Sequence, residues 1–553
     1  MRAPLPVLFF PIFYFFVSIT PIAYLFVSNT TLGGASFNAL VFNWLFTPEL
    51  VSILYSTFMF ASGGAALATL FALVYAWLVV RTDVPAKSLL ETLPTTFLIV
   101  PFIVKSLMWI ILLSPSIGVI NKMLSPLLNG FVFNIYSMEG LIFAYGMGGF
   151  PFALLSIMPV LKSMDTSLEE SARILGLGLL KTFFRITLPI IFPSVFTTFL
   201  LLTLIGLGNF DYPYILGGER IKTLATEIYY WTNQIVPPRY DIAVTYSLIY
   251  IITTFTGVSI YIWYTRKTFK FVVVTGKVSQ KTVHILGKWR IFAFVSCLGM
   301  LTISFILPFI FLILTSFITF GALAEGLRLD FTLENYQKLL KLPLMDKSFI
   351  NSISVAIITA LLCTTSAIFM AYTSLKGKIR GSIFNEYLNN FPLTFPGIVY
   401  GFGLFWLILN IPFLSQSLYG TLWVIIISLI VIRLPYSIRF ISNNLLQIGD
   451  ELEEAARVSG ASWFKSFTSV LMPLVKGGMI SSFTYIFIES IKEIGALILL
   501  VSPNTIMFTV YLLQLYSQHA AAINVVAAGS VLLVLVVATS LALLKALERM
   551  QKL

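Results

Sequence analysis

The chain has 553 residues, of which 58% are apolar and only 10% are charged, and its formal net charge is +12. A soluble globular protein has about 45–50% apolar and about 25% charged residues, so this chain has too few ionic groups to cover a soluble domain of its size. The composition excludes a water-soluble enzyme and a nucleic-acid-binding domain, although the positive charge alone would suggest the second.

Apolar segments long enough to cross the membrane as helices recur along the whole chain. A hydrocarbon core of about 30 Å needs about 20 helical residues. We therefore expect an all-α polytopic membrane protein with about 12 transmembrane helices. The first of them is predicted to be a retained span rather than a signal peptide, because no small-residue cleavage site follows it. The predicted spans are 5–28, 50–80, 92–113, 138–161, 190–208, 241–264, 291–318, 350–375, 392–410, 420–438, 474–501 and 521–544.

The distribution of basic residues predicts the orientation in the membrane. With the N-terminus in the cytoplasm, the inner segments hold 25 Lys and Arg and the outer loops hold 8. The positive-inside rule therefore places both termini in the cytoplasm of a multi-pass protein of the cell membrane. Residues 265–290 hold seven Lys and Arg and no acid, and we interpret them as a basic cytoplasmic linker resting on anionic lipid headgroups.

The same motif occurs twice, at an offset of 284 residues. Residues 168–176 read Leu-Glu-Glu-Ser-Ala-Arg-Ile-Leu-Gly, and residues 452–460 read Leu-Glu-Glu-Ala-Ala-Arg-Val-Ser-Gly. Over 168–189 and 452–473, nine of 22 aligned positions are identical, which indicates an internal repeat. Each copy predicts a short helix that ends at the glycine, then an amphipathic stretch and a proline in the first turn of the next span.

This repeat divides the chain into two six-helix domains, predicted at 1–264 and 291–553 and joined by the linker at 265–290. The motif resembles the EAA loop of binding-protein-dependent ABC importer permeases, with Ser171 where alanine is usual. Two copies in one chain resemble the fused permeases of the iron(III), thiamine and phosphonate importers. The resemblance implies two pseudo-symmetric type I ABC-importer permease domains in one chain.

The resemblance also implies the partners of the chain. The loops would dock on two separate ABC ATPase subunits at the cytoplasmic face, and an extracytoplasmic solute-binding protein would deliver the solute. The docking residues that it assigns are Glu169, Glu170, Ala172 and Gly176 in the first loop, and Glu453, Glu454, Ala456 and Gly460 in the second.

The segments that follow the two loops indicate which subgroup of ABC importer permeases the chain resembles. Residues 209–212 and 222–231 in the first half, and 492–496 and 502–504 in the second, resemble the iron(III)-type permeases. The expected solute class is therefore iron(III), thiamine or phosphonate. A polyamine, a sugar or an oxyanion is the alternative within ABC permeases. The alternative from another class is an ion-coupled secondary transporter, which requires protonatable or ion-binding groups near the midplane.

Ionisable residues at membrane depth are costly in lipid and are functional candidates by default. The sequence places Lys105, Glu489, Lys492 and Glu493 at such depth. The last three share one helical face, and they either line the translocation path or form a locally neutralised cluster against another helix. On the first reading, Asp211 is the approximate counterpart in the first half.

Other chemistry is not indicated by the motifs. Residues 176–182 and 217–223 lack the glycine directly before the lysine of a phosphate loop, so ATP hydrolysis is expected on separate subunits and the chain itself is not predicted to be an enzyme. No metal-ligand or nucleophile pattern is present, and no cofactor, metal or nucleic-acid partner is expected. His284 and His519 are isolated in the sequence and are predicted to lie at the surface or in loops.

Overall fold

The structure is a computed structural model, and we describe residues 9–31, 47–127, 129–268, 283–319, 330–375, 391–518 and 522–550. Within these ranges the regular structure is helical, apart from two isolated β-bridges, Thr82 with His284 and Ile318 with Phe331. The predicted all-α membrane fold is confirmed.

Nine helices or continuous helical runs in the described ranges are long and apolar enough to cross a membrane. They correspond to nine of the predicted spans. These are α1 (Phe9–Thr31), α3 (Pro48–Arg81), α7 (Met138–Ser163), α9 (Leu179–Thr182) with α10 (Leu188–Leu207), α12 (Tyr240–Thr268), α13 (Trp289–Leu301) with α14 (Leu307–Phe317), α17 (Met345–Leu375), α21 (Leu422–Leu445) and α27 (Ile523–Met550).

The other three predicted spans are bent, so they are not straight crossings. α4 (Lys87–Thr96) and α5 (Phe102–Leu113) meet at 105°, and α19 (Gly397–Asn410) and α20 (Pro412–Leu418) meet at 111°. Pro101 and Pro412 stand at these breaks, where a proline begins a new helix but cannot continue the old one. Counting each bent pair as one span gives up to twelve in the described residues.

The predicted span 474–501 differs most from the structure. α23 (Trp463–Ser466) and α24 (Met472–Leu474) lead into α25 (Lys476–Lys492) at an angle of 69°, and α25 ends nine residues before the predicted end. Residues 493–501 are turns whose side chains are mostly buried, and α26 (Phe508–Gln518) follows them. An apolar run alone does not distinguish such a buried turn from helix.

The chain forms two compact units, each of which combines segments from both halves of the sequence. One unit contains residues 45–226 and 253–335. In it α3 packs on α7 and α10, and a Cβ at Gly64 would lie 2.3 Å from Cδ1 of Tyr145, so the glycine permits close approach of the helices. α13 and α14 belong to this unit, and Phe305 stacks on Phe97 at 4.5 Å.

The other unit contains residues 1–44, 227–252 and 336–553. Here α17, α21 and α25 pack together, and α1 packs on α19. Two tyrosine hydroxyls fasten α1: Tyr14 donates to the carbonyl oxygen of Val431, and Tyr400 donates to that of Val17, both at 2.9 Å. The first helical span of each sequence half therefore packs in the unit that holds most of the other half.

Candidate functional site

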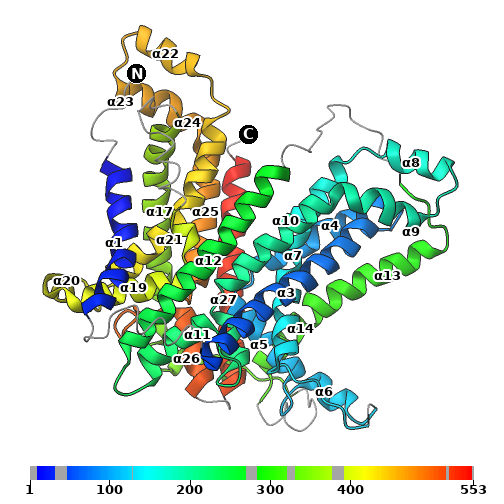
Figure 1. Cartoon of the computed structure of the whole chain (residues 1–553), viewed down its shortest axis with the longest axis horizontal. Coiled ribbons are helices and arrows are strands. Elements are labelled where there is room, and N and C mark those ends of the chain that lie inside the picture. The colour runs from blue at the N-terminus through cyan, green and yellow to red at the C-terminus, as the bar shows by residue number, and fades with distance from the viewer. Residues whose placement is uncertain are drawn as a thin grey trace. The chain divides into compact units, whose positions relative to one another are not determined.

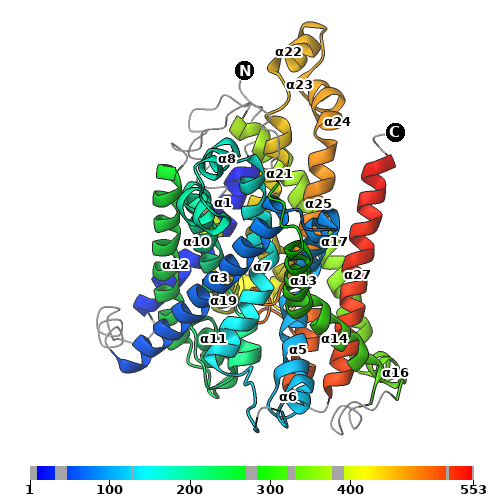
Figure 2. The ribbon, with the colours of Figure 1, turned by 90° about the vertical axis from the view of Figure 1, so that its right-hand side faces the viewer.

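The two repeated loops have the same backbone structure. In the first, α8 (Ser167–Ile174) is followed by Gly176, α9 and a π-helical turn (Phe183–Thr187) that runs into α10. In the second, α22 (Asp450–Val458) is followed by Gly460, α23 and a π-helical turn (Phe467–Leu471). α8 lies at the end of its unit opposite the short helix α6 (Val119–Leu124) (Figure 1), and α22 projects beyond α24 and α25 (Figure 2).

Both glycines adopt the left-handed conformation, with φ of +82° at Gly176 and +85° at Gly460. The turn closes in the same way in each loop: the amide of Leu177 donates to the carbonyl of Ala172 (3.0 Å), and the amide of Ala461 donates to that of Ala456 (3.1 Å). A side chain with a Cβ is strained at such a φ, so glycine fits this position. The helix end predicted at each glycine is confirmed.

The first glutamate of each motif is an internal anchor. Glu169 is only 2% exposed, and its carboxylate accepts hydrogen bonds from Arg81 Nε (3.1 Å) and the Thr187 hydroxyl (2.5 Å). Glu453 instead accepts from the Tyr372 hydroxyl (2.9 Å) and from Arg457 (2.6 Å). The first glutamate of the motif thus ties each loop to the end of a long helix. Glu169 binds Arg81 in α3, whereas Glu453 binds Tyr372 in α17.

The assigned docking residues differ in exposure. Glu169 and Ala172 are buried, and Glu170, Glu453 and Ala456 are half-buried. Glu454, Gly176 and Gly460 are exposed. Docking by these eight residues stays a prediction.

The sequence analysis missed several apolar side chains that are exposed on the surface of the two loops. Ile174 is 86% exposed and Val458, its equivalent at the offset of 284, is 89% exposed. The pairs Leu168 with Leu452 and Leu180 with Phe464 are also at least half exposed. Matched apolar residues in an otherwise charged loop were a readable signal. Exposed apolar groups at equivalent places in two loops are candidates for contact with a partner. We call these six residues the loop tips.

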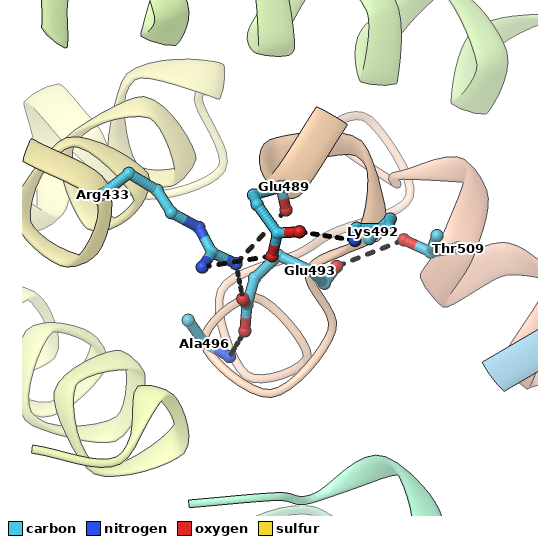
Figure 3. Close-up of polar contacts among 6 residues, drawn as sticks. All are labelled: Arg433, Glu489, Lys492, Glu493, Ala496 and Thr509. Atoms are coloured by element: carbon cyan, nitrogen blue, oxygen red, sulfur yellow. Dashed lines mark hydrogen bonds and ion pairs between the residues drawn. The ribbon is translucent and has the colours of Figure 1, made fainter. Parts of the chain in front are cut away.

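Four of the membrane-embedded charges, Arg433, Glu489, Lys492 and Glu493, form one cluster (Figure 3). Arg433 lies in the middle of α21, is 9% exposed, and pairs with Glu489 (Nη1 to Oε2, 3.6 Å) and with Glu493. Its Nη2 also donates to the carbonyl oxygen of Glu489 (3.2 Å), and Lys492 pairs with Glu489. With two cations and two carboxylates, the cluster is neutral and joins α21 to the end of α25.

The 25 inner Lys and Arg counted from the sequence include Arg433, although the predicted span 420–438 contains it, and the structure places it within α21. Removing it leaves 25 − 1 = 24 inner Lys and Arg against 8 outer ones, so the asymmetry is retained. The signal was available, because Arg433 is the one charged residue in the mainly apolar run from 422 to 438. Its partners could not be read from the sequence, since they lie 56 and 60 residues away.

Glu493 also closes the turn after α25. Its Oε1 accepts the amide of Ala496 (3.0 Å), and the Thr509 hydroxyl donates to its carbonyl oxygen (3.2 Å). In the first half, Asn209 Oδ1 accepts the amide of Tyr212 at the same distance, 3.0 Å, and at the same offset of 284. The position equivalent to Glu493 is therefore Asn209, rather than the predicted Asp211.

The charge cluster has no counterpart in the first half. Pro151 in α7 and Pro435 in α21 occupy equivalent helix-internal positions and fix the alignment. The positions equivalent to Arg433, Glu489, Lys492 and Glu493 are Gly149, Ile205, Gly208 and Asn209. Asp211 is buried, 7% exposed, in the turn after α10.

Lys105, the remaining predicted intramembrane charge, lies in the other unit. It is 5% exposed in α5, its Nζ donates to the carbonyl oxygen of Gly148 (3.3 Å), and it stands 5.2 Å from the centre of the Phe102 ring. The described residues contain no group of three or more His, Cys, Asp or Glu placed to hold a metal ion. His284 lies in a loop as predicted, but it is buried, and His519 lies outside the described residues.

The described residues thus form a polytopic helical membrane protein in which one loop structure occurs once in each half of the sequence. The chain matches the family described as "Binding-protein-dependent transport system inner membrane component" over residues 68–268 and 364–552, one region in each half. It belongs to that family.

Its curated relatives include several proteins named for ferric transport. It is 26% identical over 409 residues to the ferric transport system permease protein FbpB of Actinobacillus pleuropneumoniae, covering 73% of this chain and 58% of that one. It is 24% identical over 493 residues to the Fe(3+)-transport system permease protein FbpB 2 of Haemophilus influenzae, covering 86% and 87%. The match to FbpB 1 of H. influenzae is 26% over 383 residues and again spans only 58% of the relative's length.

Proposed function

We propose that this chain is the transmembrane subunit of an ATP-binding-cassette importer that moves iron(III) into the cytoplasm. The observation that carries the proposal is the pair of loops, which repeat the same helix, left-handed glycine, π-helical turn and exposed apolar tips. The family match in both halves supports the importer class, and the names of the relatives support iron(III) as the solute. Thiamine, phosphonate, polyamine, sugar and oxyanion are the other solutes to test.

The loops would act as docking helices for two ATPase subunits, which would carry out ATP hydrolysis. The loop tips would enter apolar grooves on these subunits, where burial stabilises each aliphatic side chain by about 1.5–3 kcal/mol. Glu170 and Glu454 would pair with cations at the rim of each contact. Closure of the ATPase pair would then shift the permease between inward- and outward-facing states.

The neutral charge cluster would line the solute path in the second half. Glu489 has the largest exposed side-chain fraction of the four residues, 24%, against 10% for Arg433. Its carboxylate is a hard oxygen ligand of the kind that hard cations prefer. Lys492 and Glu493 would belong to the same stretch of the path, with Asp211 on the first-half side.

The inferred arrangement in the membrane follows from the basic residues. Both termini and both loops would face the cytoplasm, because 24 of the Lys and Arg outside the spans lie on that side against 8 on the other. An extracytoplasmic binding protein would then deliver solute at the opposite face. Residues 1–264 and 291–553 would be the two duplicated permease domains, joined by the linker at 265–290.

The proposal is tested by reconstituting the chain with its ATPase subunits and binding protein in lipid vesicles. We expect uptake of radioactive iron(III) that requires both ATP and the binding protein. Parallel assays with thiamine, a phosphonate, a polyamine, a sugar and molybdate test the solute. Uptake driven by a proton gradient in the absence of any ATPase would overturn the ABC assignment in favour of a secondary transporter.

Tryptophan at both Gly176 and Gly460 is expected to abolish ATP-driven uptake while the protein remains in the membrane. Apart from the adjoining residues, no atom lies within 4 Å of a Cβ built at either glycine, so a side chain there starts in open space and is expected to obstruct a docked partner. Uptake and membrane abundance are measured together.

Alanine at the same two positions is the matched control for backbone strain. It carries the same left-handed cost of about 1–2 kcal/mol per residue but little bulk, so it should retain much of the uptake. Gly178→Trp adds the ring nearby, where nothing lies within 4 Å and φ is not positive. Wild-type uptake with tryptophan at both Gly176 and Gly460 would contradict docking at these turns.

A further inference from the structure

The end of the basic linker is hydrogen-bonded to the root of the first loop. Residues 283–286, which we call the linker strap, run beside the C-terminal end of α3. The amide of His284 donates to the carbonyl of Arg81 (2.9 Å), and the amide of Asp83 donates to the carbonyl of His284 (3.1 Å). The amide of Leu286 donates to Asp83 Oδ1 (2.8 Å). Three hydrogen bonds therefore hold the strap to residues 81–83.

Arg81 joins the strap to the first loop. Its backbone carbonyl accepts the hydrogen bond from the His284 amide in the strap, and its guanidinium binds the carboxylate of Glu169 in α8. The Arg81 side chain is only 4% exposed. Glu169 in turn receives the hydroxyl of Thr187, at the point where the loop returns to α10. A displacement of the strap would therefore act on the pair that anchors the loop.

The imidazole of His284 lies in a buried site among charged groups. His284 is 5% exposed, and its Nδ1 has no hydrogen-bond partner in the part of the chain that the structure describes. The charged groups around it are Arg81 from α3, Asp83 from the turn after α3, and Glu169 and Arg173 from α8. A protonated imidazole would therefore face two other cations, Arg81 and Arg173. The carboxylate of Glu169 is already paired with Arg81.

The second loop is rooted in another way. Glu453 is held by Tyr372, whose hydroxyl also accepts the indole N–H of Trp463 (2.9 Å), and by Arg457 on its own helix. Tyr372 packs edge-on against Phe467, and in the first half Trp77 packs edge-on against Phe183, the residue equivalent to Phe467. The strap contact is thus particular to the first loop among the described residues.

We propose that the linker strap is a positioning element that fixes the first loop through Arg81, and that it holds the loop only while His284 is uncharged. The inference rests on the proposed function in one respect, namely that this loop receives motion from an ATPase subunit. With the strap in place, α3, α8 and the start of α13 would move together when that subunit closes.

The protonation of His284 gives the proposal a direction with pH. Burial first, then Arg173 and Arg81, lower the pKa of His284 below its ordinary value of 6.5, while Glu169 opposes the shift. Because the pKa is lower in the folded chain than in the unfolded chain, the strap's contribution is complete above pH 6.5. It is lost as the pH falls through the folded-state pKa, so coupling should weaken in mildly acidic medium.

The first test measures binding-protein-stimulated ATP hydrolysis by the reconstituted complex. His284→Lys places a fixed cation beside Arg81 and Arg173, and we expect stimulation to fall about tenfold at neutral pH, since a buried unpaired charge is strongly unfavourable. Ile285→Lys is the matched control, because it adds the same charge to the neighbouring residue, which is 83% exposed. Stimulation unchanged by His284→Lys, or equally reduced by Ile285→Lys, overturns the proposal.

The second test uses the pH profile. His284→Gln keeps a neutral polar side chain, so at about pH 7.5 its stimulation should match the wild type. As the pH falls below 6.5, the wild type should lose stimulation and His284→Gln should lose less, because it cannot be protonated. Identical acid profiles for the two proteins overturn the role of His284.

A partner-free measurement separates the strap from the importer function. Hydrogen exchange of the His284 and Leu286 amides, measured in lipid on the full chain alone, should be slow in the wild type and Ile285→Lys and fast in His284→Lys. Fast exchange in the wild type overturns the strap, and slow exchange in His284→Lys overturns the role of an uncharged His284 in holding it. Fast exchange with unchanged stimulation overturns its role in coupling. Absence of any stimulated hydrolysis in the wild type counts against the proposed function instead, and the exchange result still decides whether the strap exists.

Discussion

Replacing Arg433 with methionine is expected to destabilise the folded chain by about 3–5 kcal/mol, the cost typical of removing one partner from a buried ion pair. Methionine fills a similar volume but leaves Glu489 and Glu493, at the end of α25, without the cation that they share. Lys492 already pairs with Glu489 and does not replace the guanidinium at Glu493. The measurement is the thermal unfolding temperature of the purified protein in detergent or lipid, together with its abundance in the membrane.

The double variant Arg433→Met with Glu493→Gln is the matched control. It removes one positive and one negative charge, leaves the Glu489–Lys492 pair, and keeps an amide oxygen to accept the Ala496 amide. Asn209 makes the equivalent contact with a neutral amide in the first half, so the double variant should recover most of the lost stability. An unfolding temperature for Arg433→Met equal to that of the wild type would contradict the structural part of this account.

The double variant also separates folding from transport. If the cluster only joins α21 to α25, a stable double variant should import iron(III) at the wild-type rate. A stable double variant with strongly reduced uptake would support the cluster as part of the solute path.

Local signals explain why the helical spans and the loops could be predicted from the sequence. Hydropathy over about 20 residues reports the length of a membrane helix, and it located the nine long helical spans and part of each of the three bent ones. The left-handed turns at Gly176 and Gly460 follow from glycine's lack of a Cβ, which is also a local property. Because the motif recurs at an offset of 284 residues, the structure expected for the first loop is also expected for the second.

The angles between consecutive helices and the contacts between distant residues do not depend on local sequence, so they could not be predicted from it. Hydropathy is unchanged by a bend, so the 105° angle at Pro101 is invisible to it. The contact of Arg433 with Glu493 joins residues 60 apart, and the packing of α1 beside α19 joins residues almost 400 apart. His284 looked like an isolated loop residue, because its burial depends on the ends of α3 and α8.

Aspartate at both Ile174 and Val458 should release the ATPase subunits without unfolding the permease. These side chains are 86% and 89% exposed, so the substitutions remove no internal packing. In a docked complex each aliphatic side chain would contribute about 1.5–3 kcal/mol by burial, so each substitution should weaken ATPase binding at least about tenfold. The Kd of the permease for its ATPase, measured in lipid nanodiscs, tests this, and ATP-driven uptake should be lost in parallel.

Val236→Asp is the control for the double tip variant, because Val236 is equally apolar and 91% exposed but lies in the segment before α12, outside the sequence of both loops. Its Kd and uptake should equal those of the wild type. The single variants Ile174→Asp and Val458→Asp add a further comparison: matched tips predict similar losses, although the loops are rooted differently, by Arg81 in one and Tyr372 in the other. Wild-type affinity in the double variant would mean that the ATPase contacts another surface, because two buried carboxylates in an apolar groove cannot be accommodated without cost.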